Sequence, residues 1–259
     1  MSFQIPEVEE HLTADTLGGL PRELFSQTLF DSNELAHRYC RDAAIELCHE
    51  LELTQKLAQP VSAAELLSSC GFVAIFRYAL QWILRMLAAD GLLIQEPHRD
   101  GTRYQCPAPL PASERRELRR RCLETESNNA ATLDLLDTVM AAYPAVARGE
   151  ISGEQALFGA GELQLWLDFF HNQNTLYAIN NQIAASAVSH TMADSDSIRI
   201  LEFGAGAGSG TDALLQALQD GGRLASIEHY RVTEPNAFFQ RKGQRLLQIG
   251  ESREVAIGD

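Results

Sequence analysis

Apolar side chains recur every three or four residues through most of the first 190 positions, a period typical of helices that bury one face. The pattern between residues 33 and 52 predicts a helix with one buried stripe, formed by Leu35, Tyr39, Ala43, Leu47 and Leu51. A second helix is expected to begin at Ser62, because Ser62-Ala-Ala-Glu65 matches a capping box. A third, strongly apolar helix is predicted over residues 72–90.

The segment after the third predicted helix has the pattern of a β-hairpin. Leu92-Leu93-Ile94 and Arg103-Tyr104 provide the strands, and Arg99-Asp100-Gly101 provides the turn. Three helices followed by a hairpin form a winged-helix arrangement, which is common in DNA-binding proteins. A recognition helix, however, needs a polar and basic face, and the third helix is mostly apolar. We therefore expect residues 1–110 to form a winged-helix-like domain whose third helix is buried in its own core or against a partner, not against DNA.

Residues 111–195 continue the helical pattern and predict a helical linker. The expected order is a helix over 112–125, a helix over 129–140, loops at Tyr143-Pro144 and from Gly149 to Gly161, and a helix over 162–190. The last helix is rich in aromatic and amide side chains and leads into the strand that follows, so it is expected to cover a site there as a lid. Tyr177 and Asn181 share one helical face and are candidate ligand contacts. Alternatively, the aromatic residues are core and the amides cap the helix or face solvent.

A glycine-rich turn between a strand and a helix is the most informative segment of the chain. A short apolar run from Ile198 to Phe203 is followed by glycines at 204, 206 and 208, and a helical pattern resumes from Ala213 to Leu218. Glycine allows a ligand to approach the backbone, because a Cβ would collide with it. The free N–H groups of a helix N-terminus favour an electronegative group. We expect a nucleotide-like ligand here; the alternative is a turn that binds nothing.

The acidic residue before the glycines narrows the class of ligand. A dinucleotide-binding fingerprint reads Gly-x-Gly-x-x-Gly and holds a pyrophosphate. Here the spacing is Glu202-x-Gly204-x-Gly206-x-Gly208. A carboxylate in this position would repel a pyrophosphate, and it suits a cationic ligand without phosphate.

A second strand is predicted after this helix. Asp220-Gly221-Gly222 ends the helix, and Ile227 to Glu234 has the composition of a strand. A carboxylate at the end of such a strand binds the two ribose hydroxyls in related folds. Glu234 is the first candidate and Glu228 the second. Pro235 fits the start of a further helix with an apolar face, formed by Phe238, Phe239, Leu246 and Leu247.

These motifs resemble those of known methyltransferases. The run from Glu202 to Gly208 resembles the first motif of class I methyltransferases, which bind S-adenosylmethionine. Tyr230-Arg-Val-Thr-Glu234-Pro-Asn-Ala-Phe-Phe239 resembles a stretch of carbon-methylating domains in polyketide synthases, with Glu234 where that family more often has Asp. The preceding segment is similar at Tyr143-Pro144, Gly149-Glu150, Leu157-Phe158, Trp166, Phe169-Phe170, Tyr177 and Asn180-Asn181. The resemblance covers about residues 130–259.

The resemblance implies a fold, a cofactor and a substrate class. Residues 196–259 would form the first βαβα portion of a Rossmann-like α/β methyltransferase fold, after the mainly α winged-helix-like domain and lid. S-adenosylmethionine would be the cofactor, with its amino acid end facing Glu202 and its binding turn formed by Gly204, Ala205, Gly206 and Gly208. The implied reaction is C-methylation of an acyl thioester on the phosphopantetheine of an acyl carrier protein, in polyketide or hybrid natural-product biosynthesis. The catalytic base is not assigned.

The length of the chain adds one expectation. Two strands and two helices cannot bury both faces of a parallel sheet. A seven-stranded methyltransferase sheet would need roughly 100 residues more. We therefore expect the 259 residues to be the front part of a longer protein or of a multidomain synthase.

Composition and charge limit the partners. With 21 Lys and Arg against 35 Asp and Glu, the net charge of −14 argues against nucleic acid. The basic run from Arg115 to Arg121 is either a helix face paired with acids such as Glu114 and Glu124, or a surface for an acidic carrier protein. No apolar run approaches the ~18 residues of a membrane span, and no signal peptide is evident. Five cysteines without metal spacing indicate reduced thiols in a cytoplasmic protein.

Several alternatives stay open. The segments from Ser62 to Leu67 and from Leu84 to Leu93 resemble the winged-helix module of small-molecule methyltransferases, where it mediates dimer contacts and closes the pocket. That resemblance favours an O-methyltransferase, and a homodimer, as the second hypothesis. A non-catalytic lid or docking module is the third. His171 is a candidate base or metal ligand, but a histidine beside two phenylalanines is more often structural, and no metal site is predicted.

Overall fold

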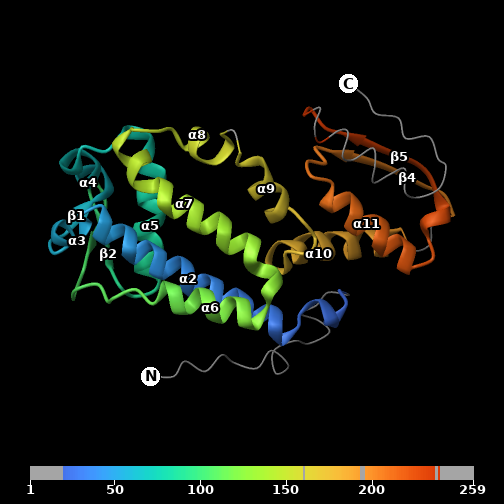
Figure 1. The fold of residues 1–259 in the computed structure, drawn as a ribbon, viewed down its shortest axis with the longest axis horizontal. Coiled ribbons are helices and arrows are strands. Elements are labelled where there is room, and N and C mark those ends of the chain that lie inside the picture. Colours follow the sequence, from blue (N-terminus) through green and yellow to red (C-terminus); the bar gives the residue numbers. More distant parts are fainter. Residues whose placement is uncertain (1–19, 160, 193–195, 237–238, 240–259) are drawn as a thin grey trace. The chain divides into compact units, whose positions relative to one another are not determined.

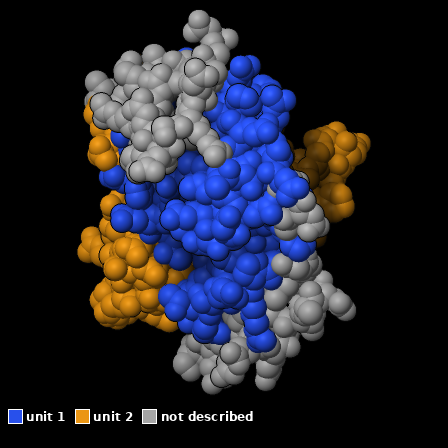
Figure 2. All heavy atoms as spheres, turned by 90° about the vertical axis from the view of Figure 1, so that its right-hand side faces the viewer, with its two compact units in different colours: residues 1–31, 166–259 blue, residues 32–165 orange. Residues whose placement is uncertain are grey.

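A computed structural model describes residues 20–159, 161–192, 196–236 and 239 of the chain. The chain divides into two compact units, one of residues 1–31 with 166–259 and one of residues 32–165 (Figure 2). Each unit has a hydrophobic core of its own. The predicted domain boundaries, after residues 110 and 195, stay a prediction.

Helices make up most of the unit of residues 32–165. In chain order they are α2 (Gln27–Glu50), α3 (Leu53–Lys56), α4 (Ala63–Cys70), α5 (Arg77–Ala89), α6 (Arg115–Thr125), α7 (Ala130–Arg148) and α8 (Gly153–Phe158), followed by the start of α9 (Leu163–Phe169). Figure 1 shows α2, α6 and α7 side by side. The stripe predicted for α2 is confirmed, since all five of its residues are at most 5% exposed.

The structure contains the helices and the β-hairpin that a winged-helix domain requires. The capping box of α4 is present: Glu65 N–H donates to Ser62 Oγ at 3.2 Å, and Ser62 N–H donates to Glu65 Oε2 at 2.7 Å. A 3₁₀ turn (Ala74–Phe76) precedes α5, so the third helix begins later than expected. Strands β2 (Ile94–His98) and β3 (Gly101–Gln105) form the predicted hairpin. A short β1 (Val61–Ser62) completes an antiparallel sheet of order β1-β3-β2.

Helix α5 is buried on one face only, so the expectation of a buried helix holds in part. Its core side is formed by Leu80, Ile83, Leu84 and Leu87. On its outer side, Tyr78 and Trp82 are 60 and 48% exposed, and Ile75 of the preceding 3₁₀ turn is 68% exposed. The guanidinium of Arg77 lies 4.7 Å from the centre of the Tyr78 ring. This outer face therefore carries large apolar and aromatic side chains between the exposed Arg77 and Arg85, unlike the polar and basic face that a recognition helix needs.

Two expectations for the middle of the chain are wrong. The predicted loop at Tyr143-Pro144 is helical, because α7 continues to Arg148 and ends at Gly149 with a φ of +75°. Pro144 is buried in that helix, so packing outweighs the missing backbone donor. Part of the loop from Gly149 to Gly161 is α8. A second capping box, Ser152-Gly-Glu-Gln155, starts α8, and this pattern in the sequence predicts a helix there.

The basic run of α6 is held largely by acids of this unit. Arg115 pairs with Glu46 and Asp137, and Arg119 pairs with Asp134 and Asp137. Arg120 pairs along its own helix with Glu117 and Glu124. The pairing interpretation is thus correct for these three arginines. Glu124 pairs with Arg120, as expected. Glu114 instead donates through its backbone N–H to the carboxylate of Asp42 at 2.6 Å.

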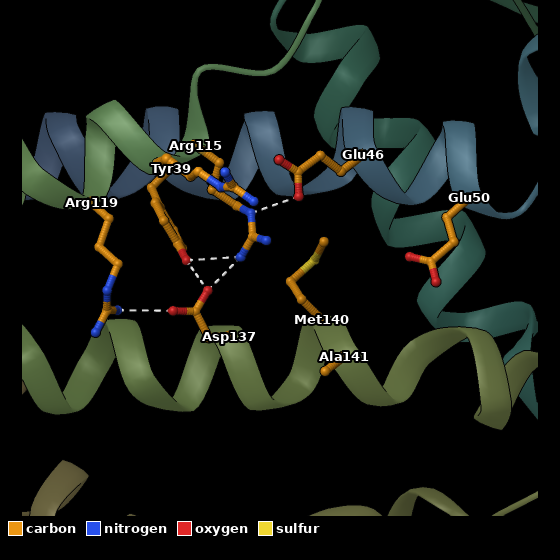
Figure 3. Close-up of a pocket in the computed structure, with 9 residues that line it drawn as sticks. Tyr39, Glu46, Glu50, Arg115, Arg119, Asp137, Met140 and Ala141 are labelled. Atoms are coloured by element: carbon orange, nitrogen blue, oxygen red, sulfur yellow. Dashed lines mark hydrogen bonds and ion pairs between the residues drawn. The ribbon is translucent and has the colours of Figure 1, made fainter.

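A pocket of about 330 Å³ lies over this network, between α2, α6 and α7 (Figure 3). Asp137 accepts from the hydroxyl of Tyr39 and from both Arg115 and Arg119. Burial and the neighbouring Asp137 carboxylate raise the pKa of Tyr39 to about 12, so its hydroxyl remains a donor. The ionic groups are therefore engaged in joining the three helices.

The other unit contains a parallel βαβ segment. Strand β4 (Ile198–Phe203) leads into α11 (Ser209–Asp220), and β5 (Ile227–Thr233) returns beside β4 in parallel register, as the sequence predicts. Its core is formed by Ile198, Leu218, Ile227, Tyr230 and Val232. The helix expected after Pro235 lies outside the described residues, apart from Phe239.

The long helix predicted over 162–190 is two helices, α9 and α10 (Thr175–Thr191), with a break between them. The break is stabilised by Asn174, whose Nδ2 donates at 2.9 Å to the carbonyl of Phe169 at the end of α9. Helix α10 packs against α11 (Figure 1). Within the described ranges, none of the helices has both the length and the hydropathy required to cross a bilayer.

Replacing Asp137 by Asn should destabilise the helical unit. The substitution keeps the shape but removes the charge that accepts from Tyr39, Arg115 and Arg119, so we expect a loss of about 1–3 kcal/mol in the free energy of unfolding. Urea denaturation followed by circular dichroism measures it. Glu124→Gln, in an exposed pair, is the control and should leave the midpoint unchanged. Equal midpoints for the two variants would contradict the role of Asp137.

Candidate functional site

The candidate site is the turn that joins β4 to α11. Gly204, Gly206 and Gly208 have φ angles of +69°, +54° and +83°, a region that residues with a Cβ rarely adopt. A Cβ built on Gly204 or on Gly206 would meet no atom within 4 Å. Glycine is therefore required here by backbone conformation, and the space above the first two glycines is open.

The end of β5 fixes the shape of this turn. The N–H groups of Gly204 and Ala205 both donate to the carbonyl of Thr233, at 2.7 and 3.2 Å. The N–H of Gly206 donates to Oε2 of Glu234 at 2.8 Å, and Oε1 of the same carboxylate accepts from Asn236 N–H at 2.9 Å. Glu234, the first candidate for the ribose hydroxyls, thus lies directly against the glycine turn.

Glu202 lies on the other side of the turn, half-buried at the end of β4. Its Oε2 accepts from Thr211 Oγ1 at 2.7 Å and from Tyr230 Oη at 2.8 Å. Burial and the adjacent Glu202 carboxylate raise the pKa of Tyr230 well above its ordinary value, so the phenol is a permanent donor. None of the ion pairs found among the described residues involves Glu202. Within the described part of the chain, the Glu202 carboxylate is therefore not neutralised by an ion pair.

Glu228, the second candidate for the ribose, is not brought to the turn. It is the second residue of β5, at the opposite end of the strand from Glu234. Its carboxylate lies 3.6 Å from Nε of Arg199 on the adjacent strand. Of the three acidic candidates, Glu202 and Glu234 therefore lie at the carboxyl ends of the strands, where parallel sheets bind ligands.

The predicted lid residues contact the first turn of α11. Tyr177 Oη lies 3.0 Å from Ser209 Oγ. Asn181 Nδ2 donates to Oδ1 of Asn172 at 2.9 Å, and Asn172 Nδ2 donates to Ser209 O and to Asp212 Oδ2 at 2.8 and 2.9 Å. Tyr177 and Asn181 thus lie beside the helix N-terminus through protein contacts, and a contact of either with a ligand stays a prediction.

Four aromatic rings pack together next to this hydrogen-bonded segment. Their centroids are 5.2 to 6.1 Å apart, and the cluster consists of Trp166, Phe169, Phe170 and Tyr177. Tyr177 belongs both to the cluster and to the contact with Ser209, so the core and lid interpretations of the aromatic residues overlap. Exposed His171 uses Nδ1 to accept from Gln173 N–H at 3.1 Å. The described residues contain no group of three or more potential metal ligands.

The sequence interpretation missed three side chains of the site. Thr211 and Tyr230 hold Glu202, and Asn172 connects α10 to α11. Thr211 was recognisable as a hydroxyl in the first turn of the helix after the glycines. Tyr230 has the alternation of an inward-facing strand residue, and its hydroxyl needs a partner when buried. Asn172 gave no usable signal, because the break between α9 and α10 was not predicted.

Comparison with solved structures shows what the fold resembles. The CurJ carbon methyltransferase matches with a TM-score of 0.70 and 21% identity, over 95% of this chain and 64% of that one. The DszA carbon methyltransferase matches with a TM-score of 0.60 and 21% identity, over 90% and 58%. The CMeT domain of the citrinin polyketide synthase matches with a TM-score of 0.59 and 15% identity, over 93% and 67%.

These matches confirm the predicted fold class, a mainly helical N-terminal part followed by the start of a Rossmann-like fold. At such identities the likeness concerns the fold alone. The chain spans about three fifths of the length of the first two structures. No protein-family model matches the sequence, and no curated protein does.

Replacing Asn172 by Ala should loosen the first turns of α11. The variant loses the donor to Ser209 O and Asp212 and the acceptor for Asn181, so we expect amide exchange in residues 209–214 to rise about tenfold. Hydrogen exchange with mass spectrometry measures it. Asn180→Ala is the control, because exposed Asn180 donates only to a carbonyl of its own helix, at 3.3 Å. Unchanged exchange in Asn172→Ala would contradict the connection.

Proposed function

We propose that this chain binds S-adenosylmethionine at the β4–α11 turn and acts in methyl transfer. One observation carries the proposal: two carboxylates, Glu202 and Glu234, flank an open glycine turn at the start of a helix. A ligand held there must be positively charged or rich in hydroxyl groups near the acids. A pyrophosphate would meet both negative charges at close range, which disfavours a dinucleotide.

The residues of the turn fit the two ends of this cofactor. Glu202 presents a carboxylate that suits an ammonium group, and Glu234 lies where a ribose diol is bound in related folds. Gly206 donates to Glu234 and thereby holds its carboxylate at the turn. Because residues 204 and 206 are glycines, no Cβ lies between the backbone and the ligand, and the space there is open.

The chemistry divides between cofactor and protein. When bound, S-adenosylmethionine supplies a methyl group made electrophilic by its sulfonium. The residues of this chain bind and orient: Glu202 and Glu234 fix the two ends, and the segment of Asn172 and Tyr177 supports the N-terminus of α11 beneath them. Holding the reacting groups in position accounts for most of what a protein contributes to a transfer of this kind.

The proposed substrate is an acyl thioester on the phosphopantetheine of an acyl carrier protein, methylated at carbon, in a cytoplasmic polyketide or hybrid pathway. Two observations support it. The solved structures that share the fold are carbon methyltransferases, one of them a domain of a polyketide synthase. The stretch from Tyr230 to Phe239 also resembles that of carbon-methylating synthase domains. An O-methyltransferase of small hydroxylated molecules is the second candidate, favoured by the helices and hairpin that a winged-helix domain requires.

Cofactor binding is tested by titrating the 259-residue chain with S-adenosylhomocysteine in a calorimeter. We expect binding, and we expect Glu202→Gln to weaken it about ten- to hundredfold, because a hydrogen bond from a charged donor loses its charged acceptor. Glu228→Gln is the matched control on the same sheet and should bind like wild type. A wild-type chain that does not bind would support the non-catalytic docking module and contradict the proposal.

The substrate class is tested separately, with the protein in its full reading frame. Methyl incorporation from labelled S-adenosylmethionine is followed on carrier-bound β-ketoacyl and malonyl thioesters and on a free phenol. We expect label on the carbon between the two carbonyls of the carrier-bound thioester, at a rate well above that of the phenol. Incorporation into the phenol alone would favour the O-methyltransferase and overturn the carrier-bound substrate.

A further inference from the structure

We propose that Tyr230 and Thr211 are positioning residues for Glu202: they fix one of its carboxylate oxygens so that the other accepts from the ammonium group of the cofactor. This inference rests on the proposed function and assigns a role in it to two side chains that do not themselves touch the ligand.

The geometry around Glu202 is asymmetric. Both donors bind the same atom, Oε2, with Thr211 Oγ1 at 2.7 Å and Tyr230 Oη at 2.8 Å. No hydrogen bond from the described residues to Oε1 is found, and Oε1 lies 3.7 Å from the position that a Cβ on Gly210 would occupy. One oxygen is therefore held by the protein, and the other faces the start of α11 with its lone pairs available.

The two donors come from different elements and are well ordered by packing. Thr211 is in the first turn of α11 and is fully buried, and Tyr230 is in the middle of β5 and is 7% exposed. Thr211 on the helix and Tyr230 on the adjacent strand therefore hold the Glu202 carboxylate of β4 from two directions. A side chain held from two directions loses little further entropy when a ligand binds, which raises affinity.

The charge state of the donors matters as much as their placement. Both donors are neutral hydroxyls, so they orient the carboxylate without cancelling its charge. An arginine in the same place would satisfy the oxygen equally well but would compete with a cationic ligand. The arrangement is thus suited to recognition of an ammonium group.

The test compares two ligands that differ only in the part that Glu202 would recognise. S-adenosylhomocysteine carries the amino acid end, and 5′-methylthioadenosine lacks it. We expect Thr211→Val and Tyr230→Phe each to weaken S-adenosylhomocysteine about five- to tenfold in calorimetric titrations, with 5′-methylthioadenosine changed by less than about twofold. Thr211→Ser restores the hydroxyl and should restore the affinity. Tyr104→Phe, which removes the hydroxyl of a buried tyrosine of the other unit, is the control.

The possible outcomes distinguish a failure of cofactor binding from a failure of the positioning role. If wild type binds neither ligand, the proposed function fails and this inference fails with it. If wild type binds both ligands but Thr211→Val and Tyr230→Phe leave the S-adenosylhomocysteine affinity unchanged, or weaken both ligands equally, only the positioning role is overturned. The 5′-methylthioadenosine affinity also shows that each variant still forms the adenosine side of the site.

Discussion

The structure of this site depends on three backbone N–H groups that bind the end of the neighbouring strand. Gly204 and Ala205 donate to Thr233, and Gly206 donates to Glu234. These bonds are available because the glycines adopt positive φ angles, which turn successive amides toward β5. The third of these bonds also holds the Glu234 carboxylate against the turn, so the bonds that shape the loop position one of the two acids of the site.

The surrounding elements stabilise that turn from both sides. On the sheet side, Thr211 and Tyr230 hold Glu202 from α11 and β5. On the helix side, Asn172 donates to the carbonyl of Ser209 and to the carboxylate of Asp212 in the first turn of α11. A turn rich in glycine, which is flexible by itself, is thereby kept in one conformation, and this lowers the ordering cost of binding.

Local patterns predicted the elements well and the side-chain networks poorly. The stripe of α2, the capping box at Ser62 and the β4–turn–α11 sequence depend on neighbouring residues, and the structure has all of them. Pro144 within α7 could not be foreseen, because its burial depends on distant packing. Glu234 is preferred to Glu228 as the candidate for the ribose hydroxyls because it follows the carboxyl end of the predicted strand. The bonds from Asn172 to α11 and from Tyr230 to Glu202 join residues 28 to 40 positions apart, so local sequence patterns do not predict them.

Under the proposed function, the ion pairs of α6 have a consequence for how a carrier-bound substrate would reach the protein. Because Arg115, Arg119 and Arg120 are compensated within the chain, they contribute little attractive field, and the excess of 14 negative charges dominates at long range. An acidic carrier diffusing freely would be slowed by this repulsion, most strongly at low ionic strength. Delivery from a carrier tethered to the same assembly would avoid the penalty, because a linker sets the local concentration regardless of charge.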